Sequence, residues 1–272
     1  MPSSYYEIHN IKNSELPIIF HRTHLEKKTS HLYYTHWHEN IELLFVTEGI
    51  LRVYLDGTEV LVPAGDVAVV NSGVLHAMTA HTPATKYFCL IIDSDFCKKH
   101  GFFIEEKKLC EVTNAESVAE NILRIDEAYF SRPPYYEEDI LSDVTKILVF
   151  LFRFHTKNDL YSGTHKKSIE VVKSGINYIK KHFREHLTID EIAAHTGYSK
   201  FYFCHCFKEL TGSTLGAYIN KYRSDYAYTL LTHTDMSIGS IAAECGFEDV
   251  SYFTKVFKKN VGVLPSHIRK KE

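Results

Sequence analysis

Six residues occur almost unchanged at two places in the last third of the sequence, IAAHTG at 192–197 and IAAECG at 241–246. The similarity continues on both sides of these motifs. The two stretches are LTIDEIAAHTGYSKFYFCHCFKELTG from 187 and MSIGSIAAECGFEDVSYFTKVFKKNVG from 236. Any fold of this chain must therefore use one local structure twice.

The repeated pattern predicts a pair of helices joined by a tight turn. A hydroxyl residue, Thr188 or Ser237, stands where a helix N-cap is expected, and Thr188 with Glu191 forms a T-x-x-E capping box. The two alanines allow a close helix crossing, and Gly197 or Gly246 allows the left-handed turn that ends the first helix. The second helix carries Phe203 and Phe207 in one copy, and Phe253 and Phe257 in the other. The offset between copies grows from 49 to 50 after the turn, which predicts one extra residue at the start of the second copy's second helix.

Helix, glycine turn and helix is the helix-turn-helix plan, although a helical repeat that only packs would look similar. Charge favours the first interpretation. Residues 167–272 hold 15 Lys and Arg against 11 Asp and Glu, whereas the whole chain has a net charge of −3. A basic C-terminal part on an acidic chain indicates a polyanionic partner at that end.

The stretch from about 168 to 270 resembles the DNA-binding domain of the AraC/XylS family of bacterial transcription regulators. The resemblance is carried by the first copy, the connecting AYINKYR and above all SIGSIAAECGFEDVSYFTKVFKKNVGVLPSHIR. Leu264 and Ile268 depart from the family's usual small polar residue and tyrosine, and neither lies in a reading helix. The resemblance implies two reading heads on double-stranded DNA. The helix between them, about 27 Å long, would hold the heads in major grooves ~34 Å apart.

The resemblance also assigns roles to individual side chains. The residues expected to read bases are Phe201, Cys204 and His205 in the first head and Val250, Ser251, Thr254 and Lys255 in the second. His205 and Lys255 can donate to guanine, while Phe201 and Val250 can contact thymine methyl groups. Cys204 can also be a simple space-filling residue. The residues expected on phosphates are Lys200, Lys208, Lys258 and Lys259.

The first part of the chain is β-rich. IELLFVTEGILRVYLDGTEVLVPAGDVAVVN, from 41, contains short apolar runs separated by turn residues, including the hairpin pair Asp56-Gly57. This spacing predicts a sandwich or barrel. From about 114 the period becomes helical, and a helix near 137–155 is apolar on more than one face, with Phe150, Phe152 and Phe154. That second face predicts either a homodimer contact or additional core.

A second constellation lies in the β-rich part. His36, His38, Glu42 and Gly49 fit H-x-H-x3-E-x6-G, and Gly65, Gly73 and His76 fit a companion pattern in which Asn71 replaces proline. These residues resemble the cupin barrel, which implies that His36, His38, Glu42 and His76 line an effector pocket. Three imidazoles and a carboxylate are also a ligand set for a transition metal, the one candidate cofactor.

We therefore expect an α+β chain with a cupin-like β-barrel and dimerisation helices over 1–160, a linker over 161–167, and an all-α tandem helix-turn-helix domain over 168–272. The expected function is sequence-specific transcription regulation, without enzymatic activity, in response to a small molecule such as a sugar or sugar derivative. The alternatives are a metal-dependent cupin enzyme and a regulator with a purely structural barrel. RNA polymerase is a further candidate partner.

The cysteine content and the lengths of the apolar runs predict a cytoplasmic protein. The six cysteines form no CxxC pair and no even framework, which is typical of reduced cytoplasmic thiols. The sequence has no run of about 20 apolar residues, so we expect no membrane span. MPSSYYEIHN has no apolar core, so we expect no signal peptide.

Overall fold

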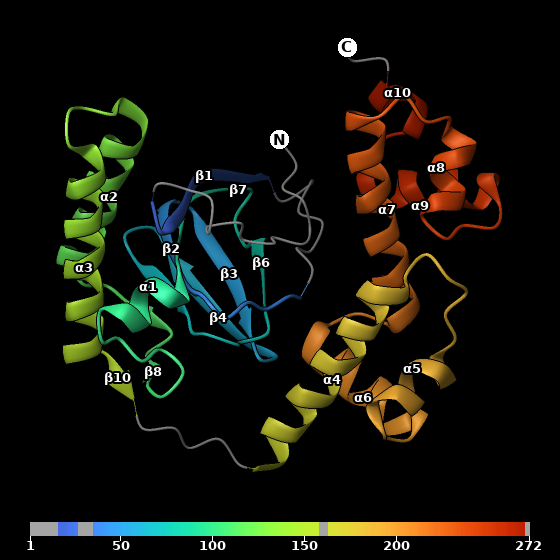
Figure 1. Cartoon of the computed structure of the whole chain (residues 1–272), viewed down its shortest axis with the longest axis horizontal. Coiled ribbons are helices and arrows are strands. Elements are labelled where there is room, and N and C mark those ends of the chain that lie inside the picture. Colours follow the sequence, from blue (N-terminus) through green and yellow to red (C-terminus); the bar gives the residue numbers. More distant parts are fainter. Residues whose placement is uncertain (1–15, 27–34, 158–162, 270–272) are drawn as a thin grey trace. The chain divides into compact units, whose positions relative to one another are not determined.

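The computed structural model describes residues 16–26, 35–157 and 163–269. The chain divides into two compact units, one within residues 8–160 and the other within 161–272 (Figure 1). Their compositions differ as the sequence predicts: the first combines β-sheets with helices, and the second is helical. In the described part of the chain, no helix has the length and apolarity needed to cross a membrane.

Two antiparallel sheets form the centre of the first unit. One has the strand order β1-β7-β2-β5-β9 and the other β4-β3-β6. Their strands are β1 (Ile18–Glu26), β2 (Ile41–Glu48), β3 (Ile50–Leu55), β4 (Thr58–Pro63), β5 (Val67–Val70), β6 (His76–Ala80), β7 (Ala84–Ile92) and β9 (Val112–Thr113). A separate short pair joins β8 (Lys108–Leu109) to β10 (Thr156–Lys157). The expected cupin-like fold is therefore present, but the described strands form two facing sheets instead of one closed barrel.

The hairpin between β3 and β4 is at the predicted place. Asp56 and Gly57 both have positive φ, 48° and 83°, as a two-residue hairpin turn requires. The buried carboxylate of Asp56 also accepts a hydrogen bond of 2.9 Å from the backbone N–H of Leu75. This turn residue thus anchors the start of β6 as well as reversing the chain.

The five-stranded sheet is buried on both faces, because successive side chains of a strand point in opposite directions. On β2, Leu44 and Val46 pack between the two sheets, with Leu51, Val53 and Met78. Leu43 and Phe45 point the other way and pack against the helices. The inter-sheet core holds the positions of the predicted pocket, whereas the outer face holds the helices.

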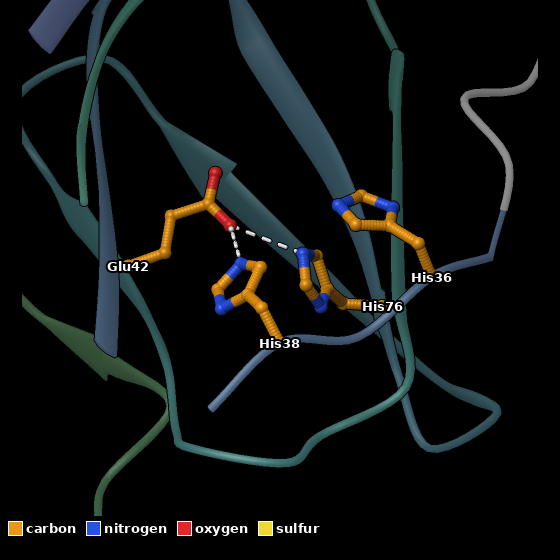
Figure 2. A group of neighbouring side chains, drawn as sticks. All are labelled: His36, His38, Glu42 and His76. Carbon is orange, nitrogen blue, oxygen red and sulfur yellow. Dashed lines mark hydrogen bonds and ion pairs between the residues drawn. The ribbon is translucent and has the colours of Figure 1, made fainter. Parts of the chain in front are cut away.

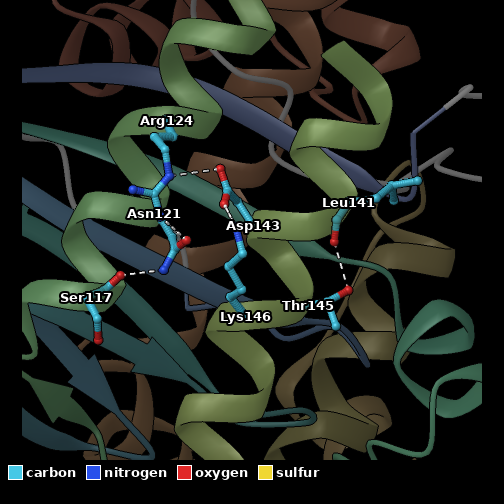
Figure 3. A network of polar contacts seen from close by, with 7 residues as sticks. All are labelled: Ser117, Asn121, Arg124, Leu141, Asp143, Thr145 and Lys146. Atoms are coloured by element: carbon cyan, nitrogen blue, oxygen red, sulfur yellow. Dashed lines mark hydrogen bonds and ion pairs between the residues drawn. The ribbon is translucent and has the colours of Figure 1, made fainter. Parts of the chain in front are cut away.

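Two antiparallel helices, α2 (Glu116–Ser131) and α3 (Tyr136–Phe154), cover the outer face of that sheet, and the short α1 (Ser94–Lys99) follows β7 (Figure 1). Asp143 of α3 joins the pair (Figure 3): its carboxylate lies 3.2 Å from Arg124 of α2 and 2.8 Å from Lys146. Phe152 of α3 is partly buried against the core between the five-stranded sheet and the helices, and its ring centroid lies 5.2 Å from that of Phe102. Additional core is therefore the correct interpretation for Phe152, while Phe154 remains 64% exposed.

The second unit contains seven helices in its described residues. They are α4 (Gly163–His182), α5 (Ile189–Thr196), α6 (Lys200–Thr211), α7 (Leu215–His233), α8 (Ile238–Glu244), α9 (Val250–Val261) and α10 (Pro265–Arg269). Residues 161–162 of the predicted linker lie outside the described residues, and 163–167 belong to α4. The predicted linker therefore overlaps the start of α4, because polar residues with turn propensity are tolerated in the first turns of a helix supported further along by packing.

The repeat forms two helix-turn-helix units, α5–α6 and α8–α9. Thr188 and Glu191 form the predicted capping box, and Ser237 caps α8. Gly197 and Gly246 adopt φ of 75° and 78°. The extra residue of the second copy lies in the turn and not in the helix, because Ser199 and Asp249 cap α6 and α9 in the same way.

Candidate functional site

The four predicted pocket residues come together in the first unit (Figure 2). Glu42 lies on β2 and His76 on β6, while His36 and His38 precede β2. One donor atom from each side chain lies within 4.8 Å of the others. His76 is fully buried and Glu42 is 4% exposed. The convergence predicted from the spacing of the motif is therefore confirmed.

Backbone carbonyls orient two of the imidazole rings. Nδ1 of His38 lies 3.1 Å from the carbonyl oxygen of Asn40, and Nδ1 of His76 lies 2.9 Å from that of Val74. Since a carbonyl oxygen only accepts, both Nδ1 atoms donate and carry a proton. The Nε2 atoms then face the same oxygen, Oε2 of Glu42, at 3.2 Å and 3.0 Å. The buried Nε2 of His76 makes no hydrogen bond among the described residues, so its contact with Glu42 is counted as an ion pair by distance.

Glu42 supplies the negative charge of this cluster. Burial opposes ionisation of the carboxyl, but the contacts with His38 and His76 outweigh it and hold the pKa of Glu42 well below its usual range. Its other oxygen, Oε1, accepts a hydrogen bond of 3.0 Å from Sγ of Cys89 on β7. The sequence patterns do not include Cys89, because only the pairing of β2 with β7 brings it beside Glu42.

The donor set fits a transition-metal ion. A metal with bonds of about 2.1 Å places its donors roughly 3–4.2 Å apart, which is close to the spacing found here. Histidine ligands usually donate their second N–H to a backbone carbonyl or carboxylate, as His38 and His76 do. The lowered pKa of Glu42 requires positive charge beside its carboxylate, because the Nε2 lone pairs of two neutral rings would repel it. Further protons on the rings or a bound cation supply that charge.

The companion pattern has a structural role around this cluster. Gly65 and Gly73 have positive φ, 99° and 71°. Asn71, which stands in place of proline, is buried and exchanges two hydrogen bonds with the backbone of Leu109, of 3.0 Å and 2.8 Å. Asn71 therefore connects β8 to the end of β5 by hydrogen bonds, near the cluster.

The predicted base-reading residues lie on α6 and α9. Phe201 is 87% exposed and the His205 side chain 78% exposed, while Val250, Ser251 and Lys255 are exposed on α9. Cys204 and Thr254 are half-buried. The hydroxyl of Thr254 donates to the carbonyl of Val250 at 2.9 Å, which leaves its oxygen available only as an acceptor and its methyl group as an apolar surface.

The four lysines predicted to contact phosphates are all exposed. Lys258 and Lys259 lie in the last turn of α9 and Lys208 in the last turn of α6. Lys200 lies 3.0 Å from the carboxylate of Asp190 on α5 and forms an ion pair with it. Tyr252, absent from the predicted readers, is 51% exposed in the first turn of α9, and its hydroxyl accepts a hydrogen bond from Asn220.

Comparison with known proteins identifies both units. Residues 192–271 match the family model of a helix-turn-helix domain, and residues 22–92 match that of a cupin domain. A relative of nearly full length is the uncharacterized HTH-type transcriptional regulator YdeC of Bacillus subtilis, 23% identical over 97% of this chain and 95% of its own. The melibiose operon regulatory protein of Escherichia coli is 22% identical over 92% of this chain and 88% of its own.

Two further comparisons concern the DNA-binding unit and the fold. The probable transcription factor PqrA of Proteus vulgaris is 41% identical over 31% of this chain and 70% of its own. The solved structure of ToxT from Vibrio cholerae covers 93% of this chain and 98% of its own, with a TM-score of 0.51 and 15% identity, so it shares the fold. The chain therefore belongs to the AraC/XylS family of DNA-binding transcription regulators, with a cupin-type ligand-binding domain ahead of the tandem helix-turn-helix domain.

Proposed function

We propose that this regulator controls DNA occupancy through a ligand bound at His36, His38, Glu42 and His76. The observation that carries the proposal is the pair of Nε2 atoms, from His38 and His76, that lie 3.2 Å and 3.0 Å from one buried carboxylate oxygen. A ligand at this position would bind one arrangement of the protein more tightly than another and so shift the population that occupies DNA.

The size of the cluster constrains the ligand. Its donor atoms lie within 4.8 Å of one another, which leaves room between them for a single ion and not for a sugar ring. We propose a divalent transition metal at this position. A sugar or sugar derivative remains the proposed effector, bound beside the ion on the half-buried side formed by His36 and His38. The resemblance to the melibiose operon regulatory protein supports a sugar.

On the DNA side, we propose that α6 and α9 enter adjacent major grooves and that the seven predicted residues read bases. The exposure of five of them supports this assignment, since only Cys204 and Thr254 are half-buried. The position of each at or beyond the capped start of a helix that follows a glycine turn supports it as well. Lys200, Lys208, Lys258 and Lys259 would contact phosphates and set the register. We propose that the regulator, once bound to DNA, contacts RNA polymerase at a promoter.

We propose a homodimer formed through the outer face of α2 and α3. Phe154, at the end of α3, is 64% exposed. A groove between the two helices is lined in part by Val149, Phe150 and Phe154. An apolar surface of this kind on a soluble domain commonly marks a contact with another protein, and a two-fold axis would bury it against itself.

The ligand proposal is tested by thermal unfolding of the full chain in three arms: a divalent metal alone, a panel of sugars alone, and both together. We expect Zn²⁺, Ni²⁺ or Mn²⁺ to raise the melting temperature, and one sugar to raise it further only with metal present. The Glu42→Gln variant should lose both shifts. If no metal shifts the wild-type protein while a sugar does, the metal is excluded and the pocket binds the sugar directly.

A further inference from the structure

The two reading helices are joined by α7, but the structure provides a second connection. Residues 183–185, which follow α4, contact the second helix-turn-helix unit directly. Phe183 is buried and packs edge-on against Tyr222 and Tyr226 of α7, with ring centroids 5.1 Å and 5.0 Å away. We call residues 183–185 together with Arg223 the bridge.

Arg184 connects the bridge to α8. Its guanidinium group lies 4.8 Å from the centroid of the Tyr226 ring and donates a hydrogen bond of 2.6 Å to the Tyr226 hydroxyl. The same group forms an ion pair of 2.8 Å with Glu244, the last residue of α8. The Arg184 side chain thus links the end of α4, the middle of α7 and helix α8, the first helix of the second helix-turn-helix unit.

Arg223 makes the reverse connection from α7. It donates hydrogen bonds to the carbonyl oxygens of Phe183 and Glu185, at 2.8 Å and 2.7 Å. Its guanidinium also lies 5.6 Å from the centroid of Phe247, the buried aromatic residue of the second turn. Because these hydrogen bonds go to backbone carbonyls, they fix the position of residues 183–185 independently of the side chains at 183 and 185.

The backbone of the second turn touches the bridge as well. Gly246 has a φ of 78°, and a Cβ there would lie 2.6 Å from the carbonyl oxygen of Phe183 and 2.9 Å from that of Arg184. Glycine is therefore required both for the turn and for this close approach. Helix α4 also packs on the first helix-turn-helix unit. Its Gly175 lies so close to the Phe203 ring of α6 that a Cβ at this position would not fit.

We infer that the bridge fixes the second reading helix relative to the first, so that operator spacing is a property of the DNA-binding unit. Because α4 packs on α6 and its end packs on the α8–α9 turn, the two heads are held at two places instead of by α7 alone. One base pair inserted between two boxes turns the second box by about 34° and moves it by about 3.4 Å, which such a unit cannot follow. The inference rests on DNA recognition through both α6 and α9, and it assigns Arg184, Arg223 and Gly246 as positioning residues.

The test measures spacing preference with the full chain. The probes are a duplex selected from a random library by the wild-type protein and the same duplex with one base pair inserted between its two boxes. For Arg184→Ala, the ratio between the dissociation constants for the two duplexes should fall by about threefold to tenfold, since the change removes an ion pair and a stacked cation. Glu244→Gln, a surface change, should act in the same direction but more weakly.

Glu185→Ala is the matched control. It lies in the same segment, its side chain contacts His182 of the adjoining helix end, and its carbonyl remains available to Arg223. It should leave the spacing preference unchanged. Equal losses on both duplexes for Arg184→Ala and Glu244→Gln would overturn the bridge while leaving two-headed recognition intact. A wild-type protein that is indifferent to spacing would overturn both.

Discussion

The backbones of His36 and His76 exchange two hydrogen bonds, of 3.0 Å and 2.8 Å, and the centroids of their rings lie 4.0 Å apart. This pairing brings a residue ahead of β2 to the first residue of β6 and places both rings beside Glu42. The cluster is therefore built from backbone pairing as well as from side chains, and removing one ligand should leave the fold in place.

The first prediction concerns metal binding. His76→Ala should abolish stoichiometric binding of Zn²⁺ or Ni²⁺ to protein prepared without chelators, because it removes the most deeply buried of the four ligands. Isothermal titration and elemental analysis measure the loss. His24→Ala, an exposed change on β1, is the control and should bind as the wild type does. Undiminished binding by the His76 variant would place the metal elsewhere.

The second prediction separates base reading from phosphate contact on α9. Lys255→Ala should cost ~1–3 kcal/mol on the correct operator and relax preference at one base pair. Lys258→Ala should weaken binding to all sequences alike and reduce the slope of log K against log salt by about one. Titrations on operator and scrambled duplexes at several salt concentrations distinguish them. An unchanged specificity ratio for Lys255→Ala would contradict its assignment.

The third prediction concerns the outer face of α2 and α3. Phe154→Glu should convert a dimer into monomers, because it places a charge in an apolar contact. Phe152 is unsuitable for this purpose, since its ring packs inward against Phe102. Sedimentation velocity measures the change, and Leu61→Glu on β4, a comparably exposed apolar position, should remain dimeric. A wild-type protein that is monomeric at high micromolar concentration would refute the proposal.

The fourth prediction follows from Lys180 near the end of α4. Burial lowers the pKa of Lys180 to about 8, so between about pH 8 and 10.5 the folded state binds fewer protons than the unfolded state. Stability should therefore rise with pH across this window as the cost of burying a charge disappears. Lys180→Met should raise the free energy of unfolding by about 1 kcal/mol at pH 7 and by much less at pH 10.5.

Urea denaturation of both proteins at the two pH values measures this difference. Lys181→Met, at the neighbouring exposed position, is the control and should show no such pH dependence. A Lys180→Met gain that is equal at pH 7 and pH 10.5 would mean that burial of the charge is not its source.

Local sequence determined most of the elements. The capping box at Thr188, the glycines at 197 and 246 and the hairpin at Asp56-Gly57 each act within a few residues, so their structures follow from short-range chemistry. The spacing of His36, His38 and Glu42 likewise predicted one cluster, although His36 and His38 lie ahead of β2 and not within a strand. The repeat identified two helix-turn-helix units.

Tertiary structure decided what depends on contacts between distant segments. The sequence cannot show that Cys89 reaches Glu42, that Phe152 turns inward while Phe154 does not, or that Arg184 reaches Glu244. Each of these depends on strand register or on the angle at which helices pack, and many such arrangements share one apolar pattern. The sequence by itself determined the elements, the family and the candidate ligands, whereas packing alone determined which nitrogen atoms face the carboxylate and how the two helix-turn-helix units are held together.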